Sequence, residues 1–305
     1  MTYINGSGGT TYYEENLSNS TITLDNGTLQ TGSTGIIFLD YHNTLNLSGS
    51  STINGNIVVG WDRNTITLGA NFVIGSGSNL FYSGTLDLSQ YGFTGGGTVA
   101  VFGQYTTDGT TFQTSAVTIG NGVTIGGNLY VGEDPSYTNG LGGLATTGDT
   151  SAQTNPNALY GGTLTLEGTT SGKTQITLDG VIHIGGGSKK GVTGYGTLEL
   201  GGNIQFTTQN DLSNGITFDD YAKFDSGTYT ISLDGVFEVN GQQSTIILSS
   251  NGNSLGQLKV ENGKFTSTDT NLTGYHYRRI GRHGKAYGAY GQSINWLSNR
   301  LWNFC

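Results

Sequence analysis

The tetrapeptide Thr21-Ile22-Thr23-Leu24 carries the pattern that decides the fold, because close variants of it return along most of the chain. Its apolar residues lie two positions apart, so on an extended chain both point to one side while the threonines face solvent. Each such stretch is predicted to be a half-buried β-strand. The variants are Thr44-Leu45-Asn46-Leu47, Thr65-Ile66-Thr67-Leu68, Thr85-Leu86-Asp87-Leu88, Thr163-Leu164-Thr165-Leu166, Gln175-Ile176-Thr177-Leu178, Thr197-Leu198-Glu199-Leu200 and Thr230-Ile231-Ser232-Leu233.

The spacing of these strands indicates a repeat architecture. They begin at residues 21, 44, 65 and 85 and again at 175 and 197, in steps of 23, 21, 20 and 22 residues. A period of this size is typical of a solenoid in which each repeat forms one coil. Other alternating stretches, such as Val123-Thr124-Ile125-Gly126, end on a glycine that can turn the chain. We therefore expect an all-β fold, a right-handed parallel β-helix (a single-stranded β-solenoid), over residues 21–274.

The composition agrees with a thin core. Only 34% of the 305 residues are hydrophobic, 53 are glycine and 11% are charged, and a narrow coil needs few inward side chains. A β-sandwich is the main rival, since Asn26-Gly27 and Asp179-Gly180 could form tight hairpins. The step that recurs through most of the chain favours the solenoid, and the period of about 40 residues that a propeller requires is absent.

Two stretches interrupt the rhythm and are expected to be loop insertions, at residues 103–116 and 133–161. Residues 1–20 precede the first clear strand and are expected to cap the solenoid, whose end strands would otherwise be unpaired. They lack the basic start and apolar run of a secretory signal peptide.

Residues 275–305 differ from the rest of the chain. From residue 276 on, the sequence contains five of the 12 basic residues and no Asp or Glu. We expect an atypical basic and aromatic tail outside the solenoid, and three explanations are open: an amphipathic anchor, a partner-binding segment or a frameshifted end. A solenoid end left bare would favour end-to-end self-association.

Charge and cysteine content exclude several classes of protein. The net charge of -9 opposes binding to a phosphate backbone, so nucleic acid is not an expected partner. No apolar run approaches the roughly 18 residues of a transmembrane segment. A single cysteine can form neither an internal disulfide nor a cysteine-based zinc site. The glycine-rich turns lack the repeated pattern of a calcium-binding β-roll. We therefore expect no metal and no cofactor.

Exposed aromatic residues in and near the insertions are the candidate binding residues. Tyrosine rings can stack on sugar rings while neighbouring polar groups bind hydroxyls, so a ledge is expected from Tyr105, Tyr137, Tyr160, Lys189, Lys190 and Tyr195. For an alternative catalytic role, Asp219 and Asp220 resemble the paired carboxylates of β-helix polysaccharide hydrolases. Adjacent strand residues point to opposite faces, so solvated surface carboxylates are the favoured interpretation. His183 alternates with apolar neighbours and is expected to face outward.

Two strand phrases carry a family resemblance. Gly161-Gly162-Thr163-Leu164-Thr165-Leu166-Glu167-Gly168 and Val123-Thr124-Ile125-Gly126-Gly127-Asn128-Leu129-Tyr130-Val131-Gly132 resemble β-strand-repeat passenger regions of bacterial autotransporters and related surface adhesins. The likeness covers about residues 15–272. The chain is also similar to proteins of acetic-acid bacteria in which such a region precedes a self-cleaving Hint domain. That domain begins with a nucleophilic Cys, whereas Cys305 ends this chain.

The resemblance implies a secreted or cell-surface location and a structural, adhesive role. We therefore expect a non-catalytic β-solenoid module whose partners are glycans or other surface proteins. The alternative is a polysaccharide hydrolase or lyase of the tailspike or pectinase type.

Overall fold

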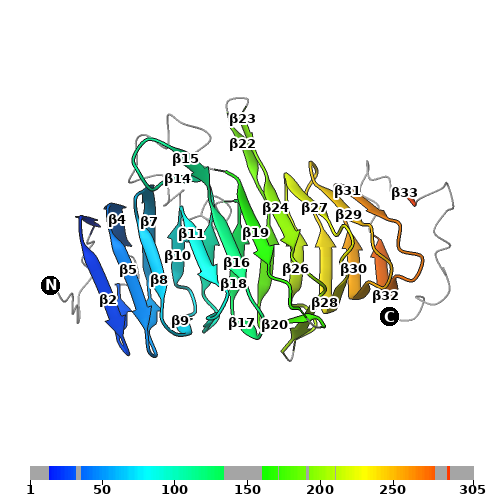
Figure 1. Ribbon diagram of the computed structural model, residues 1–305, viewed down its shortest axis with the longest axis horizontal. Coiled ribbons are helices and arrows are strands. Elements are labelled where there is room, and N and C mark those ends of the chain that lie inside the picture. The colour runs from blue at the N-terminus through cyan, green and yellow to red at the C-terminus, as the bar shows by residue number, and fades with distance from the viewer. Residues whose placement is uncertain are drawn as a thin grey trace, which may run out of the picture.

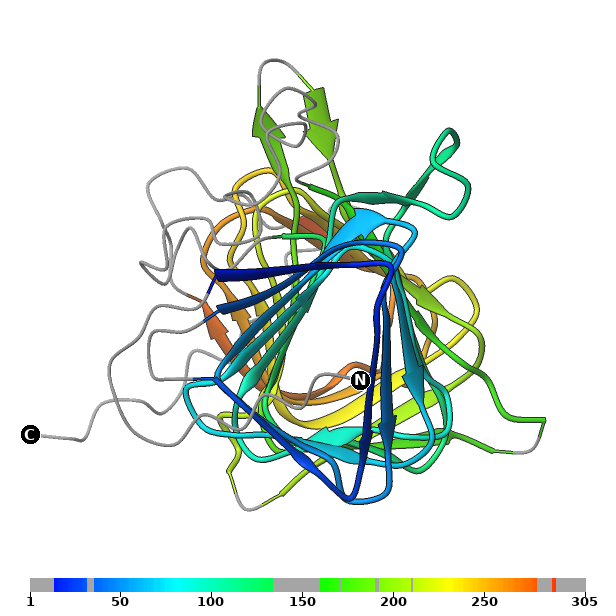
Figure 2. The ribbon, with the colours of Figure 1, turned by 90° about the vertical axis from the view of Figure 1, so that its left-hand side faces the viewer.

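The chain is a right-handed parallel β-helix with a roughly triangular cross-section (Figures 1 and 2). The computed structural model describes residues 14–31, 36–133, 160–170, 172–189, 192–209, 211–278 and 287–288. Within these ranges the regular elements are all strands, and no helix is long and apolar enough to cross a membrane. Seen from the N-terminal end, the chain turns clockwise as it recedes (Figure 2), which is the right-handed sense.

Each coil contributes one strand to each of three faces, and nearly every strand pairs in parallel with its equivalents in the coils before and after it. Face 1 is built from β1 (Glu14–Ser18), β4 (Ile36–Tyr41), β7 (Asn56–Asp62), β10 (Asn79–Tyr82), β13 (Thr98–Val101), β18 (Asn128–Val131), β21 (Val181–Ile184) and β26 (Gly215–Phe218).

Face 2 follows after the first corner and contains six of the eight phrases recognised in the sequence. Its strands are β2 (Thr21–Asp25), β5 (Thr44–Ser48), β8 (Thr65–Leu68), β11 (Thr85–Leu88), β16 (Ala116–Ile119), β19 (Gly162–Leu166), β24 (Gly196–Leu200), β27 (Ala222–Asp225), β29 (Thr245–Leu248), β31 (Lys264–Ser267) and β33 (Tyr287–Gly288).

Face 3 closes each coil. It contains β3 (Thr28–Gln30), β6 (Thr52–Asn54), β9 (Phe72–Ile74), β12 (Phe93–Thr94), β17 (Val123–Ile125), β20 (Thr174–Leu178) and β25 (Ile204–Thr208). Three long strands, β28 (Ile231–Val239), β30 (Ser254–Val260) and β32 (Thr273–Arg278), bend around the corner from face 3 to face 1. The phrases that begin at residues 175 and 230 lie on face 3, in β20 and at the start of β28, so the predicted step from residue 175 to residue 197 joins strands of different faces.

The strands stack in register, so the same inward position is apolar in coil after coil. On face 1, Leu80, Val99, Leu129 and Ile182 follow one another along the helix and are all fully buried. Burial of one or two such side chains per strand removes apolar surface from water, which stabilises the fold by about 25 cal/mol for each Å² buried. A continuous core therefore forms from a sequence with few hydrophobic residues.

Buried amides reinforce the corner between face 1 and face 2 in the first coils. The Asn64 side chain, 4% exposed, donates to the carbonyl oxygens of Leu39, Asp40 and Gly60 and accepts from the Asn43 backbone N–H. Polar groups inside a protein are stable when they are hydrogen-bonded in this way. The corner thus binds successive coils through side chains as well as through strand pairing.

Two hairpins extend from the coils in the described residues. Within 103–116 the chain forms an antiparallel hairpin, β14 (Gln104–Thr106) and β15 (Phe112–Thr114). Of the second stretch, 133–161, residues 134–159 lie outside the described part of the chain. A second hairpin, β22 (Gly187–Lys189) and β23 (Val192–Gly194), was not anticipated from the sequence.

At both ends the strand ladder extends beyond the expected limits of the solenoid. Residues 14–18, assigned to the cap, form β1 and pair with β4. Residues 275–278, assigned to the tail, belong to β32 and pair with β30, and β33 pairs with β31. Backbone pairing needs no particular side chains, which is why the change in composition at residue 275 does not end the ladder in the described residues.

Candidate functional site

Three consecutive coils carry insertions at the same corner, between face 1 and face 2. The hairpin β14–β15 leaves after β13, residues 134–159 are inserted after β18, and the hairpin β22–β23 leaves after β21. Both hairpins project from the same side of the triangular helix (Figure 2). Because adjacent coils are about 4.8 Å apart, the bases of these insertions meet in one place.

Glycines make this close meeting possible. Gly132 has a φ of +91°, and a Cβ there would lie 2.3 Å from the carbonyl oxygen of Gly185. A Cβ on Gly194 would lie 2.3 Å from the Tyr160 carbonyl oxygen. The Gly161 N–H donates to the Gly132 carbonyl oxygen at 2.7 Å, and the Gly162 N–H donates to the Tyr195 carbonyl oxygen at 3.1 Å. The segments that leave and return at the corner are therefore joined through their backbones.

Two of the predicted ledge tyrosines lie together at this corner. The Tyr160 ring lies against Gly187 at the base of β22. Tyr195 follows β23 and is 40% exposed. The Lys223 Nζ lies 3.2 Å from the centroid of the Tyr195 ring, a cation–π contact, and Tyr221 meets the same ring edge-on at 6.2 Å. Lys223 therefore covers one face of the Tyr195 ring, and Lys223 and Tyr221 together hold the ring in place.

The other predicted ledge residues are placed elsewhere or are not described. Tyr105 lies on β14, where its hydroxyl is bonded to Thr85 Oγ1 at 2.8 Å and donates to Gln113 at 3.0 Å, so it belongs to the other hairpin. Lys189 pairs with the residue opposite it in β23 through its backbone, and its side chain lies outside the described part. Tyr137 and Lys190 also lie outside the described residues.

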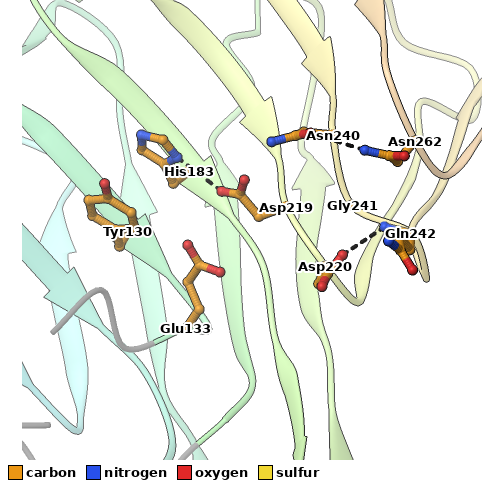
Figure 3. Close-up of a pocket in the computed structure, with 9 residues that line it drawn as sticks. All are labelled: Tyr130, Glu133, His183, Asp219, Asp220, Asn240, Gly241, Gln242 and Asn262. Carbon is orange, nitrogen blue, oxygen red and sulfur yellow. Dashed lines mark hydrogen bonds and ion pairs between the residues drawn. The ribbon is translucent and has the colours of Figure 1, made fainter. Parts of the chain in front are cut away.

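An open cavity of about 480 Å³ lies on face 1 beside this corner (Figure 3). It crosses five successive coils, from β18 to β30, because its lining residues lie on or just after the face 1 strands. The lining is Tyr130, Glu133, His183, Asp219, Asp220, Asn240, Gly241, Gln242 and Asn262. Carboxylates, amides and one imidazole thus dominate the wall.

A group of three ionisable side chains occupies one end of the cavity (Figure 3). His183 Nδ1 and Asp219 Oδ2 lie 2.9 Å apart, and the ligand atoms of Glu133, His183 and Asp219 all lie within 4.8 Å of one another. The His183 ring stacks on Tyr130, with centroids 4.2 Å apart and planes at 5°. His183 faces outward, as its alternation with apolar neighbours predicts.

The cavity end has a negative electrostatic environment. Burial, with the nearby charges of Glu133 and Asp219, raises the pKa of Tyr130 to about 12. Burial also raises the pKa of Glu238, on the adjacent strand, against the opposing effect of Lys259. The Tyr130 phenol and the Glu238 carboxyl are both partly removed from water, and the charges of nearby carboxylates add to both shifts.

Asp219 and Asp220 do not converge as a catalytic pair. Asp219 points to His183, while Asp220 is exposed and accepts a hydrogen bond from the Gln242 backbone N–H at 2.7 Å (Figure 3). The chain does turn here, as the φ of +60° at Tyr221 records, but the two carboxylates diverge. Asp220 matches the interpretation as a solvated carboxylate, whereas Asp219 is half-buried and bonded.

The sequence did not indicate that Glu133 and Asp219 would meet at His183. These residues are 50 and 36 positions from the histidine, on coils separated by insertions of different lengths. The outward alternation at His183 and Tyr130 was the available signal, but cross-strand partners can be assigned only when the register is known. Strand pairing places Tyr130 directly opposite His183.

Comparison with protein-family models, with curated proteins and with solved structures gives no match for this chain.

Proposed function

We propose that this chain is a secreted or cell-surface structural and adhesive module that binds glycans at the corner between face 1 and face 2, without catalysis. The observation that carries the proposal is the position of two hairpins, β14–β15 and β22–β23, at one corner of the coils beside an open polar cavity. Such a corner on a stiff stack of coils suits presentation of a binding surface away from the cell.

The chemistry of the corner supports a hydroxyl-rich ligand. Tyr195 offers an exposed ring fixed from one side by Lys223, and aromatic rings of this kind stack on sugars. The cavity adjoins it, since Asp220 lines the cavity and the next residue, Tyr221, contacts Tyr195. Asn240 and Asn262 add amides that can both donate to and accept from hydroxyl groups.

Adhesion through one weak binding corner per chain requires many chains to bind together. Weak contacts gain strength when several are made at once by a linked set of sites, and a surface array of such rods would supply them. The resemblance of the strand phrases to adhesin passenger regions supports the same location and role.

A polysaccharide hydrolase or lyase is the second candidate, and one observation favours it. Glu133 and Asp219 present oxygens within 4.8 Å of each other beside the cavity, while retaining glycosidases hold their two carboxyl groups about 5–5.5 Å apart. In this alternative the reacting pair would be Glu133 and Asp219, since Asp219 and Asp220 diverge.

A glycan array with parallel product analysis separates the two functions. The wild-type chain is expected to be retained on neutral or acidic polysaccharides and to release no new reducing or unsaturated ends. Tyr195→Ala should weaken retention about three- to tenfold, the value of one stacked ring. Tyr229→Ala is the matched control, because Tyr229 is equally exposed, at 38%, but lies between β27 and β28 at another corner.

Product release would overturn the adhesive proposal. If release is abolished by Glu133→Gln or Asp219→Asn, but not by Asp220→Asn, while the fold is intact, the chain is an enzyme whose reacting pair is Glu133 and Asp219. Equal loss of retention in Tyr195→Ala and Tyr229→Ala would instead show that the glycan does not bind at this corner.

A further inference from the structure

Three successive coils each deliver one metal-ligating side chain to the same point of the cavity. Glu133 follows β18, His183 lies on β21 and Asp219 follows β26 (Figure 3). The group combines an imidazole with two carboxylates, which is more selective than a cluster of acidic side chains alone. Imidazole and carboxylate together are ligands of Zn²⁺ and related divalent cations.

The distances in this group are compatible with a shared cation. The His183 nitrogen and the Asp219 oxygen are 2.9 Å apart, and the Glu133 oxygen lies within 4.8 Å of both. Metal–nitrogen and metal–oxygen bonds of about 2.0–2.2 Å place two ligand atoms on one ion roughly 3 Å apart. A small adjustment of the Glu133 side chain would complete the set.

Glycine keeps the point between the ligands accessible. A Cβ on Gly185 would lie 2.5 Å from Glu133 Oε2 and 3.1 Å from Asp219 Cβ. A side chain at this position would therefore displace the Glu133 carboxylate and crowd the Cβ of Asp219. The φ of Gly185 is not in the left-handed region, so its conformation does not require glycine, whereas the space for the Glu133 and Asp219 side chains does.

The ligands are also held in place by the coil structure. The His183 ring is fixed against Tyr130, and the Asp219 backbone N–H donates to the Ile184 carbonyl oxygen at 2.8 Å. Sites whose ligands are positioned before binding lose less entropy when the ion enters. The surrounding carboxylates, Asp220 and Glu238, add negative charge that attracts a cation.

We propose that Glu133, His183 and Asp219 bind one divalent transition-metal cation of the Zn²⁺ or Mn²⁺ type. The remaining coordination positions face the cavity and are open to water or to ligand hydroxyls. The site lies in the cavity that adjoins the proposed glycan-binding corner, but the metal proposal is argued from the three side chains and Gly185 and does not depend on the adhesive function.

Cobalt provides a direct readout of the site. The full chain, dialysed against EDTA and then against metal-free buffer, is titrated with Co²⁺ while the visible d–d absorption is recorded, and Zn²⁺ binding is measured by calorimetry. We expect saturation at about one ion per chain and displacement of Co²⁺ by Zn²⁺. Asp219→Asn, which preserves side-chain shape, should weaken Zn²⁺ binding at least tenfold, and His183→Ala should abolish the Co²⁺ spectrum.

Asp220→Asn is the matched control, because it removes a carboxylate from the same cavity that points away from the group. Its affinity should stay within about threefold of wild type, and circular dichroism should be unchanged in all variants. Absence of saturable binding at 1 mM Co²⁺, or equal weakening in Asp219→Asn and Asp220→Asn, would overturn the proposal. A chain that binds one cation but no glycan would retain this site and refute only the adhesive function.

Discussion

Replacement of Asn64 by Ala tests whether buried amides hold the coils together. The Asn64 Nδ2 atom lies 3.2, 2.7 and 2.9 Å from the carbonyl oxygens of Leu39, Asp40 and Gly60, and Oδ1 accepts from the Asn43 N–H at 2.8 Å. An amide nitrogen has two hydrogens, so about three full bonds are lost. At about 1 kcal/mol each, we expect a loss of about 3 kcal/mol in the free energy of unfolding.

Asn46→Ala is the matched control for this substitution. Asn46 faces outward on β5, and its one side-chain hydrogen bond to the described part of the chain is donated to Thr23 Oγ1 at 3.2 Å. Such surface changes fall within about 0.5 kcal/mol. Urea unfolding followed by far-ultraviolet circular dichroism measures both variants, and hydrogen exchange identifies which coils open. If Asn64→Ala is no more than 1 kcal/mol less stable than Asn46→Ala, the amide corner does not stabilise the stack as argued.

Two further predictions concern the insertion corner and the pH dependence of stability. Gly132→Ala introduces a Cβ that would lie 2.3 Å from a backbone oxygen, at a residue whose φ is +91°, so hydrogen exchange at the corner should rise. Gly77→Ala is the control, because its Cβ would meet open space at a φ of +75° and should act through backbone strain alone. Equal effects of the two substitutions would show that close packing at Gly132 is not what stabilises the corner. Burial raises the pKa of Asp269, but hydrogen bonds from Asn253 and neighbouring N–H groups outweigh it and lower the pKa below its ordinary value. The carboxylate therefore stabilises the fold above the ordinary pKa near 3.9, and this contribution is lost as the pH falls through the lower native value. Asp269→Asn should be less stable at pH 7 and show a smaller further loss between pH 5 and 2 in acid unfolding, and an unchanged acid profile would refute the assignment.

The repeating strands were predictable because the alternation within each phrase indicates which of its side chains are buried. In Thr163-Leu164-Thr165-Leu166 the leucines are fully buried and the threonines are partly exposed, as a period of two requires. Alternation within a single strand does not depend on how the rest of the chain is arranged. Parallel pairing is indicated by the regular spacing of about 20 residues between successive strands.

The site could not be predicted in the same way, because it depends on register across insertions. Glu133 precedes residues 134–159, and the chain returns to β21 only after another face 2 and face 3 strand. Nothing in the local sequence indicates that His183 will lie opposite Tyr130. The β22–β23 hairpin was missed for a similar reason, since its two strands have only three residues each and show no alternation long enough to recognise.

The proposed binding surface consists of the insertion corner and the adjoining cavity. Hydrogen–deuterium exchange with and without a polysaccharide that the chain retains tests this assignment most directly. We predict protection of backbone amides in residues 181–188, 193–197, 215–221 and 236–242, with no change along β29 and β31. Protection confined to face 2 or face 3, or none at all with saturating ligand, would contradict the account.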